Sequence, residues 1–438
     1  MTSIWNDFGF SDNPYNPRPI EANEEGEQLL VGRGTELRNI KARLSSSGTH
    51  PTLEGQNGVG KTSLATIALY QMFKSFRDGA SQQAIIPASD PLQLTPSDHA
   101  VAFKKRVLFR AAQTMIEHHD LLRSRGYNIP DVSAIETWLN SPTASGWSGG
   151  FNLAGAAGVS AGASTTFNTG QGFAEDGFVS TVQQWLRDCF PTQASGAIVF
   201  VIDNLEILET SRAARQMLES LRDELLGLRG LRWVICGARG IMRSAASSPR
   251  LQGVLADPLE VAPLPDTVIP ELIRSRIEVF SIDSDPLVPV DEHSFEHLYT
   301  VGNKNLRNAF KFSEDFSIWV SERGYDQISA QDLRDLLEIW MAEIADRYEE
   351  ATTGITPTGW RVFDQLCSTG GFTSPSQYSE YGFESPQALR PYLKNLEDAN
   401  LIESSVDDSD NRRKSISVSS SGWVVAYKRA GYQSQPAS

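Results

Sequence analysis

Residues 55–62 read Gly-Gln-Asn-Gly-Val-Gly-Lys-Thr, and this stretch decides the fold of the chain. It matches G-x-x-x-x-G-K-T, in which glycines let successive backbone N–H groups turn toward a phosphate. The run 51–54 before it is suited to end a buried strand, and residues 63–73 after it form an apolar helical segment. Strand, glycine-rich turn and helix in this order predict a P-loop, whose helix N-terminus faces the phosphate. A chance glycine-rich turn is the alternative.

A P-loop assigns chemistry to individual residues. We expect Lys61 to reach the β- and γ-phosphates of ATP, and the Thr62 hydroxyl to hold a Mg²⁺ ion. ATP and Mg²⁺ are therefore the predicted cofactors. The residues of the loop and its exit that we expect to bind the nucleotide are Gly55, Asn57, Gly58, Val59, Gly60, Lys61, Thr62 and Ser63.

A second motif supplies a carboxylate for the same site. Residues 196–202 are small or apolar, as in a central parallel strand that is buried on both faces, and Asp203 ends the run. In a P-loop protein an acid at this position matches the Walker B pattern and helps to hold Mg²⁺. We therefore assign Thr62 and Asp203 as the metal site.

Composition and charge limit the function classes. With 438 residues, 40% hydrophobic and 21% charged, the chain has room for two or three globular domains. The formal net charge of −15 excludes a uniformly basic nucleic-acid binder. Residues 351–438 carry eight Lys/Arg and nine Asp/Glu, a net −1, which leaves −14 for the rest. A DNA contact, if there is one, is therefore expected in the C-terminal part.

The expected compartment is the cytoplasm. No apolar run approaches the length of a membrane span, so no membrane partner is predicted, and the N-terminus lacks a signal-peptide pattern. The three cysteines, Cys189, Cys236 and Cys367, lie far apart in the sequence, which suits a reducing compartment and excludes a cysteine-based zinc site.

Residues 1–28 are expected to form an extended arm, because prolines recur in 14–19 and helix signals are few. Its aromatic residues could pin the arm to the body of the protein or to a neighbouring subunit. A plain surface leader is the alternative. The four aromatic residues concerned are Trp5, Phe8, Phe10 and Tyr15.

A resemblance to a known family enters with Val31-Gly-Arg33 and Glu36, a V-G-R-x-x-E-L segment shortly before the P-loop. This segment resembles the one that packs over the adenine in AAA+ ATPases of the origin-recognition type, and it is shared with the STAND signalling ATPases. The resemblance implies that Arg33 shapes the nucleotide pocket. Without it, the segment reads as a capped helix start.

The same resemblance implies the residues that drive hydrolysis. Most AAA+ proteins have Glu directly after the Walker B Asp, but here Asn204 follows and Glu206 lies three places after Asp203, which is more similar to the STAND variant. We assign Glu206 as the residue that activates water; it could instead simply begin the following helix. Arg239 stands, after the strand 231–237, where STAND proteins often have an arginine that senses the γ-phosphate.

An arginine finger is expected before the last core strand. In origin-recognition ATPases a Ser-Arg-Leu segment there reaches the next subunit, and this implies Arg250, with Arg243 as the second candidate. An ordinary surface arginine is the alternative.

Residues 281–348 resemble the helical lid of these ATPases. The family's lid carries G-x-x-R, whereas Asn305 occupies the arginine position here, so Arg307 or Lys304 is expected to serve instead, and we assign Arg307 to the nucleotide site. His293 and His297 lie one helical turn apart and could bind a metal, although exposed histidines at a helix start are more common.

Residues 354–434 predict three helices followed by a two-stranded ribbon, which resembles a winged helix. On this interpretation Gln387, Arg390 and Lys394 face the major groove of double-stranded DNA. The wing residues Arg412, Arg413 and Lys414 then contact phosphates. The alternative is a winged helix that makes protein contacts.

The sequence thus predicts an α/β fold with a P-loop, AAA+/STAND-like parallel-sheet core (29–280), a helical lid (281–348) and a C-terminal winged helix (354–434). The uncharged segment 137–174 is expected to be a disordered loop or an inserted β-hairpin. The predicted function is a Mg-ATP-dependent ATPase whose nucleotide state controls assembly, as a homo-oligomer or with partner subunits, and DNA binding. Two alternatives are a STAND-like signalling or defence switch and an ATP-binding protein that does not turn over.

Overall fold

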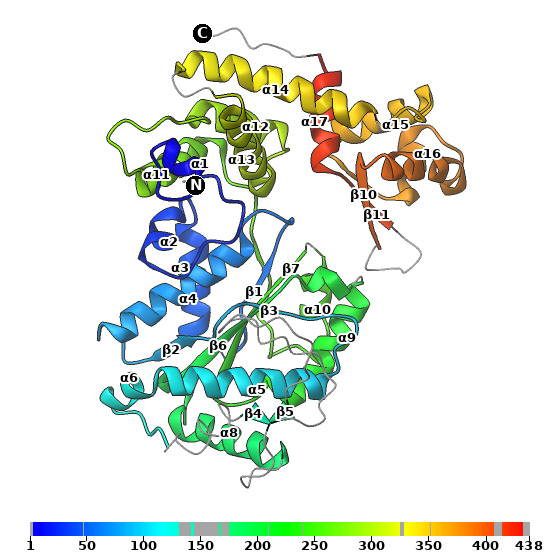
Figure 1. Ribbon diagram of the computed structural model, residues 1–438. Helices are drawn as coiled ribbons and strands as arrows, with labels where there is room; N and C mark the ends of the chain where they lie inside the picture. The colour runs from blue at the N-terminus through cyan, green and yellow to red at the C-terminus, as the bar shows by residue number, and fades with distance from the viewer. Residues whose placement is uncertain are drawn as a thin grey trace.

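A computed structural model describes the chain in ten stretches. The helices and strands below lie within these stretches and are labelled as in Figure 1. The described residues are 3–46, 48–130, 142–143, 166–167, 175–208, 210–238, 240–324, 328–350, 352–406 and 414–431.

A parallel β-sheet forms the centre of the lower half of the molecule in Figure 1. Its strand order is β2-β6-β7-β1-β8, so β7 separates the P-loop strand β1 from the Asp203 strand β6. The small strand β3 (Leu92–Gln93) pairs with the end of β6. The five strands in this order have the following bounds: β1 (Thr52–Glu54), β2 (Ala84–Pro87), β6 (Gly196–Asp203), β7 (Leu231–Gly237) and β8 (Leu259–Glu260).

Helices cover both faces of this sheet. Successive side chains of β6 point to opposite faces, so they pack alternately against the two helical layers. Ile198, Phe200 and Ile202 pack in one core cluster, against the layer that contains α5, while Val199 and Val201 pack in the other, against α4. Asp203, the last residue of β6, points to the same face as Val199 and Val201, which is the face covered by α4. One layer consists of α3 (Gly34–Ser46) and α4 (Lys61–Arg77); the other includes α5 (Ala100–Glu117), α6 (His119–Ser124), α8 (Glu175–Cys189), α9 (Ser211–Leu221) and α10 (Ile241–Ala246).

A separate helical cluster lies above the sheet layers. Its apolar core includes Ile273, Phe295, Phe316 and Trp340, one from each of four helices. The helix ending at residue 280, which the sequence assigned to the core, packs in this cluster. The four helices are α11 (Ile269–Phe280), α12 (Glu292–Val301), α13 (Leu306–Glu322) and α14 (Ala330–Glu350).

The N-terminal arm belongs to the same cluster and is not simply extended. It contains two short helices, α1 (Ile4–Asp7) and α2 (Glu24–Leu29). Phe10 and Tyr15 are fully buried, and the Tyr15 hydroxyl donates to the Val290 carbonyl at 2.8 Å. The aromatic side chains therefore pin the arm to its own chain. The alternatives of a surface leader and of an aromatic anchor on a neighbouring subunit do not hold.

The C-terminal unit has the predicted three-helix and ribbon layout, with two additions. A third strand, β9, pairs with β11, and a final helix, α17, packs against α14. Val424 of α17 is buried in the lid cluster, whereas its neighbour Val425 is buried in the winged-helix core. The elements are α15 (Pro357–Ser368), β9 (Phe372–Thr373), a 3₁₀ segment (Pro375–Tyr381), α16 (Pro386–Asp398), β10 (Ile402–Val406), β11 (Lys414–Val418) and α17 (Ser420–Arg429).

Together these units confirm the predicted fold class: a parallel α/β core with a P-loop, a helical lid and a winged-helix C-terminus. Of the segment 137–174, the structure describes only the antiparallel pair β4 (Pro142–Thr143) and β5 (Thr166–Phe167). The rest of that segment, with the predictions made for it, lies outside the described residues. None of the helices in the described part of the chain has the length and apolar character that a bilayer span requires.

Candidate functional site

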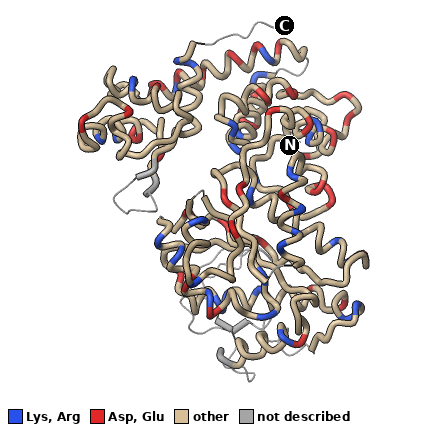
Figure 2. Tube along the Cα trace, turned by 180° about the vertical axis from the view of Figure 1, so that it is seen from behind, with Lys and Arg blue, Asp and Glu red and all other residues tan. Residues whose placement is uncertain are grey.

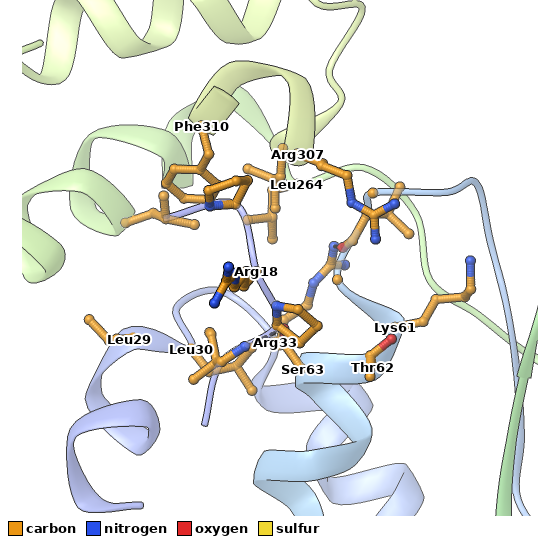
Figure 3. Close-up of a pocket in the computed structure, with 18 of the residues that line it drawn as sticks. Arg18, Leu29, Leu30, Arg33, Lys61, Thr62, Ser63, Leu264, Arg307 and Phe310 are labelled. Atoms are coloured by element: carbon orange, nitrogen blue, oxygen red, sulfur yellow. Dashed lines mark hydrogen bonds between the residues drawn. The ribbon is translucent and has the colours of Figure 1, made fainter. Parts of the chain in front are cut away.

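A pocket lies where the start of α4 meets the N-terminal arm and the lid helices (Figure 3). The P-loop forms one wall, the lid residue Arg307 reaches in from above, and apolar side chains close the far end. Most of the predicted nucleotide residues line it. The lining residues from these predictions are Arg33, Asn57, Gly58, Val59, Gly60, Lys61, Thr62, Ser63, Asp203 and Arg307.

The glycines of the loop are required by its geometry. Gly58 and Gly60 have φ of +82° and +94°, a region that side chains with a Cβ rarely adopt. A Cβ on Gly55 would lie 2.5 Å from the Val261 carbonyl oxygen. Gly60 caps α4, so the helix begins at Lys61 and directs its free N–H groups toward the loop. The predicted cradle for a phosphate is therefore formed.

Lys61 is held inside this cradle. Its Nζ donates to the carbonyl oxygens of Gly55 at 2.9 Å and Gln56 at 3.0 Å, and the residue is only 5% exposed. Phosphate oxygens would offer this ammonium group stronger, charge-assisted hydrogen bonds than the backbone carbonyls do. The side chain can exchange one set of acceptors for the other without leaving the loop.

The two motifs that predict the metal site meet directly. The Thr62 hydroxyl donates to Asp203 Oδ2 at 2.7 Å, although the residues are 141 positions apart in the chain. Asp203 Oδ1 is buried and has no hydrogen-bond partner among the residues that the structure describes. A hydroxyl and a carboxylate with a free oxygen are hard oxygen donors, which Mg²⁺ prefers, so these residues fit the predicted ion.

Glu206 and Asn204 face different surroundings. Asn204 lines the pocket beside Asp203 and has φ of +56°, an uncommon conformation for a residue other than glycine. Glu206 Oε2 accepts the backbone N–H of Ala238 at 3.2 Å, and its Oε1 is buried without a hydrogen-bond partner in the described part of the chain. Glu206 therefore points at the end of β7, the strand between the P-loop and Asp203.

A buried thiol reports that these charges lie close together. Burial raises the pKa of Cys236 well above its usual value, the negative charges of Asp203 and Glu206 raise it further, and Lys61 lowers it. Cys236 is the second-last residue of β7 and is fully buried. The three charged groups therefore lie around the carboxyl end of that strand. The sheet thus brings Glu206 near the metal and phosphate residues.

Arg33 connects the segment before α3 to the P-loop. Its guanidinium pairs with Glu36 at 3.0 Å and donates to the Val59 carbonyl at 3.0 Å. The residue is 4% exposed, so both contacts are shielded from water. Arg33 lies in the pocket, as predicted, and in this structure it also fixes the loop backbone.

The far end of the pocket contains residues that sequence reasoning missed. Arg276 is buried, its guanidinium lies 4.0 Å from the ring centroid of Phe310, and it donates to the Pro14 carbonyl at 3.1 Å. Burial lowers its pKa to about 10. Arg18 of the arm lines the same end (Figure 3). The only available signal was an arginine on the apolar face of α11.

Three predicted arginines lie elsewhere. Arg250 is 59% exposed and lies 3.9 Å from both Glu219 and Asp223 of the α9 region, and it does not line the pocket. Arg243 pairs at 2.6 Å with Glu54, the fully buried last residue of β1. Arg239 lies outside the described residues. The structure therefore leaves the roles of Arg250 and Arg239 as predictions.

The predicted DNA-facing side chains of α16 are exposed. Gln387, Arg390 and Lys394 lie on its solvent side, while Leu389 and Leu393 pack inward. Arg412 and Arg413 lie outside the described residues, and only the backbone of Lys414, in β11, is described. Figure 2 shows positive and negative residues interspersed along the trace.

The histidine pair on α12 is accounted for by a different contact. His297 lies 3.0 Å from Glu338 of α14, and its ring packs against Tyr427 of α17. No group of three or more potential metal ligands from His, Cys, Asp or Glu occurs among the described residues. His297 therefore links the lid to the last helix.

Comparisons with known proteins return structures only: no family model matches the sequence, and no curated protein matches it. The ORC1 protein of Aeropyrum pernix in complex with DNA is 14% identical, with a TM-score of 0.45 over 98% of each chain. A Walker-type ATPase of Pyrococcus abyssi is 13% identical, with a TM-score of 0.46 over 95% of this chain and 99% of that one. Drosophila ORC bound to DNA gives 14% identity and a TM-score of 0.37 over 94% and 93%. Each of these matches covers most of both chains at low sequence identity.

Proposed function

We propose that the chain is a Mg-ATP-dependent ATPase whose nucleotide state controls its assembly and its binding to DNA through the winged helix. The observation that carries the ATPase part is the 2.7 Å bond between Thr62 and Asp203. It joins two motifs that lie 141 positions apart in the chain, beside a glycine loop that holds the buried Lys61.

In the proposed mechanism each side chain has one task. The loop N–H groups and Lys61 bind the phosphate oxygens, and Lys61 exchanges the carbonyls of Gly55 and Gln56 for them. Thr62 and Asp203 would hold a Mg²⁺ ion, which when bound would supply positive charge beside the phosphates. Glu206 orients and deprotonates the attacking water, and Arg307 binds the phosphates from the lid. Arg239 senses the γ-phosphate, and Arg250 reaches the site of a neighbouring subunit.

Binding of a fluorescent ATP analogue, with and without Mg²⁺, tests the nucleotide site. We expect Lys61→Ala to abolish turnover and to weaken binding, and Asp203→Asn to remove the effect of Mg²⁺ on binding. Lys74→Ala is the matched control, because Lys74 lies on the same helix but pairs at the surface with Glu27. Unchanged binding by Lys61→Ala would contradict the proposal.

DNA binding is proposed for the exposed face of α16. Support comes from Arg390 and Lys394, which form no ion pair with any described residue, and from the near-neutral charge of the C-terminal part. The test is fluorescence anisotropy with duplex DNA at several salt concentrations, with and without ATP. Replacing both residues by Ala should weaken binding and lower the salt slope by about 1 for each phosphate that the variant no longer neutralises. Lys311→Ala, at an exposed site on the lid, is the control.

A signalling switch remains the second candidate, and one observation favours it. Helix α17 docks the winged helix on the lid through buried Val424 and through ion pairs from Lys428 to Asp346 and Glu349. A winged helix used for protein contacts would be docked in this way. Absence of DNA binding at low salt with ATP present would reject the first candidate in favour of this one.

A further inference from the structure

The turn Gly302–Asn305, between α12 and α13, contacts three separate parts of the chain. Asn305 donates to the P-loop at Asn57, Lys304 pairs with Asp266 before α11, and Asn303 donates to Gly370 of the winged helix. These partners come from the core, the base of the lid and the C-terminal unit. A shift of any of these three parts therefore changes a contact of this turn.

The contact with the P-loop uses both ends of one amide. Asn305 Nδ2 donates to the Asn57 carbonyl at 2.8 Å, while Oδ1 accepts the N–H of Asn308 at 3.3 Å and caps α13. The fit is close, because a Cβ on Gly58 would lie 2.3 Å from Asn305 Oδ1. A shift of the loop backbone must therefore displace the start of α13 or break this bond.

The backbone of the turn is held in an unfavourable conformation. Asn303 and Lys304 have φ of +52° and +59°, and neither is glycine. Left-handed conformations are uncommon for residues other than glycine, so they persist where surrounding contacts fix them. Those contacts are the N–H of Lys304 to Tyr299, its ion pair with Asp266, and the amide of Asn303.

The contact with the winged helix falls at a turn that contains two glycines with positive φ. Asn303 Nδ2 donates to the Gly370 carbonyl at 3.3 Å. Next to it, Gly371 has φ of +79°, and a Cβ there would lie 2.3 Å from the ring of Trp423 on α17. Movement of Gly370 is thereby transmitted to α17, the helix that docks on the lid.

We propose that Asn303 and Asn305 are positioning residues that link the conformation of the P-loop to the placement of the winged helix. Asn305 acts through the Asn57 carbonyl, and Asn303 passes the resulting shift of the turn to Gly370. The inference rests on the proposed function, because it requires that nucleotide binds at the P-loop.

The test measures the distance between spin labels on the core and on the winged helix. Labels are placed at Gln216→Cys on α9 and Ser379→Cys, both exposed, in full-length protein that carries Cys367→Ser. The other two cysteines are buried. Nucleotide affinity is measured on every variant, so that loss of binding and loss of coupling are separated.

Three variants distinguish the contacts. Asn303→Gly keeps a residue that tolerates positive φ and removes only the amide. Asn400→Gly is the control, because it makes the same change at another asparagine with positive φ, outside the turn. Asn305→Ser retains a capping hydroxyl and removes the donor to Asn57. Melting temperatures check that all three variants are folded.

We expect Mg-ATP to shift the label distance in the wild type and in Asn400→Gly. In Asn303→Gly the nucleotide should bind with wild-type affinity while the distance no longer responds. In Asn305→Ser the response should also be lost, with binding weakened up to about tenfold by the loss of one hydrogen bond. A wild-type response in Asn303→Gly, or no response in the nucleotide-bound wild type, overturns the inference. Failure of the wild type to bind nucleotide overturns the proposed function and the inference with it.

Discussion

Glu206 is the residue on which turnover depends in the proposed mechanism. Its carboxylate is fixed by the N–H of Ala238, and its second oxygen is buried with no hydrogen-bond partner from the described ranges. It lies near the end of β7, as Asp203 and Lys61 do. A water between the phosphate and this oxygen would satisfy it. Asn204, which lines the pocket, cannot accept a proton at neutral pH.

Replacing Glu206 by Gln should therefore lower kcat by about 100-fold or more, the usual contribution of a general base, and leave ATP binding unchanged. The amide still accepts the Ala238 N–H, so the fold is retained. Steady-state phosphate release and equilibrium binding give the two quantities. Full turnover by Glu206→Gln, with turnover lost in Asn204→Ala, would show that Glu206 is not the general base and that Asn204 orients the attacking water.

His50 makes the stability of the sheet depend on pH. Burial lowers its pKa to about 4, with a smaller lowering from Arg232, while the bond to the Leu226 carbonyl opposes the shift. The folded state therefore favours neutral His50, and the unfolded state binds more protons between pH 6.5 and 4. In this window stability falls as the pH falls, and the loss is about 2 kcal/mol at pH 5.

The measurement is urea unfolding at pH 7.5 and pH 5 for the wild type and for His50→Gln. Gln offers an N–H in place of the ring Nε2 donor and does not titrate. The wild type should lose about 2 kcal/mol more than the variant between the two pH values. Equal losses would mean that His50 does not control the pH dependence.

Helix α17 joins two hydrophobic cores with adjacent residues. Val424 lies in the lid cluster and Val425 in the winged-helix core. Val424→Ala removes two buried methyl groups at the docking contact and should weaken it by about 2 kcal/mol. Val425→Ala makes the same chemical change inside the winged helix.

Hydrogen exchange distinguishes the two variants. Val424→Ala should accelerate exchange in α17 and the adjoining part of α14, and leave α15 and α16 protected. Val425→Ala should accelerate exchange in α15, α16 and β11 instead. Identical exchange patterns would show that α17 does not join two separable units.

The elements around the P-loop could be predicted because local sequence specifies them. The glycine spacing, the apolar run that ends in Asp203 and the helix after Lys61 each carry their signal within a few residues. The α17 helix carries no such signal: its residues are mostly small or β-branched, and its stability comes from packing on α14.

The site was predictable to the same extent. Residues inside a motif, such as Thr62 and Asp203, were found because their chemistry is tied to fixed spacing. Arg276 and the Asn305 contact were not found, because both depend on which distant segments meet. In the sequence, Arg276 is only an arginine on an apolar helix face. Its role in the pocket becomes visible because the arm and Phe310 surround it in the structure.

On the scale of the whole molecule, the predicted finger is on the wrong side to serve its own pocket. Arg250 follows α10 and faces α9, while the pocket opens between α4 and the lid. Its carboxylate neighbours lie at 3.9 Å and the side chain is largely exposed, so surface screening leaves these pairs weak. It is therefore available to a second copy of the chain.

Mixing two inactive variants tests whether one copy completes the site of another. The Arg250→Ala variant has an intact nucleotide pocket but lacks the finger. The Lys61→Ala variant has the finger, but its own pocket cannot hydrolyse ATP. Each should be inactive alone, since a finger contributes about 10³–10⁵ in kcat. An equimolar mixture should regain turnover, because Arg250 of the Lys61→Ala copy reaches the intact pocket of its neighbour.

Arg243→Ala is the control. Its partner Glu54 lies in the same chain, directly before that chain's own P-loop, so mixing Arg243→Ala with Lys61→Ala should not restore turnover. A mixture of Arg250→Ala with Lys61→Ala that stays inactive, although both variants assemble, would contradict a finger supplied in trans and leave Arg250 a surface residue.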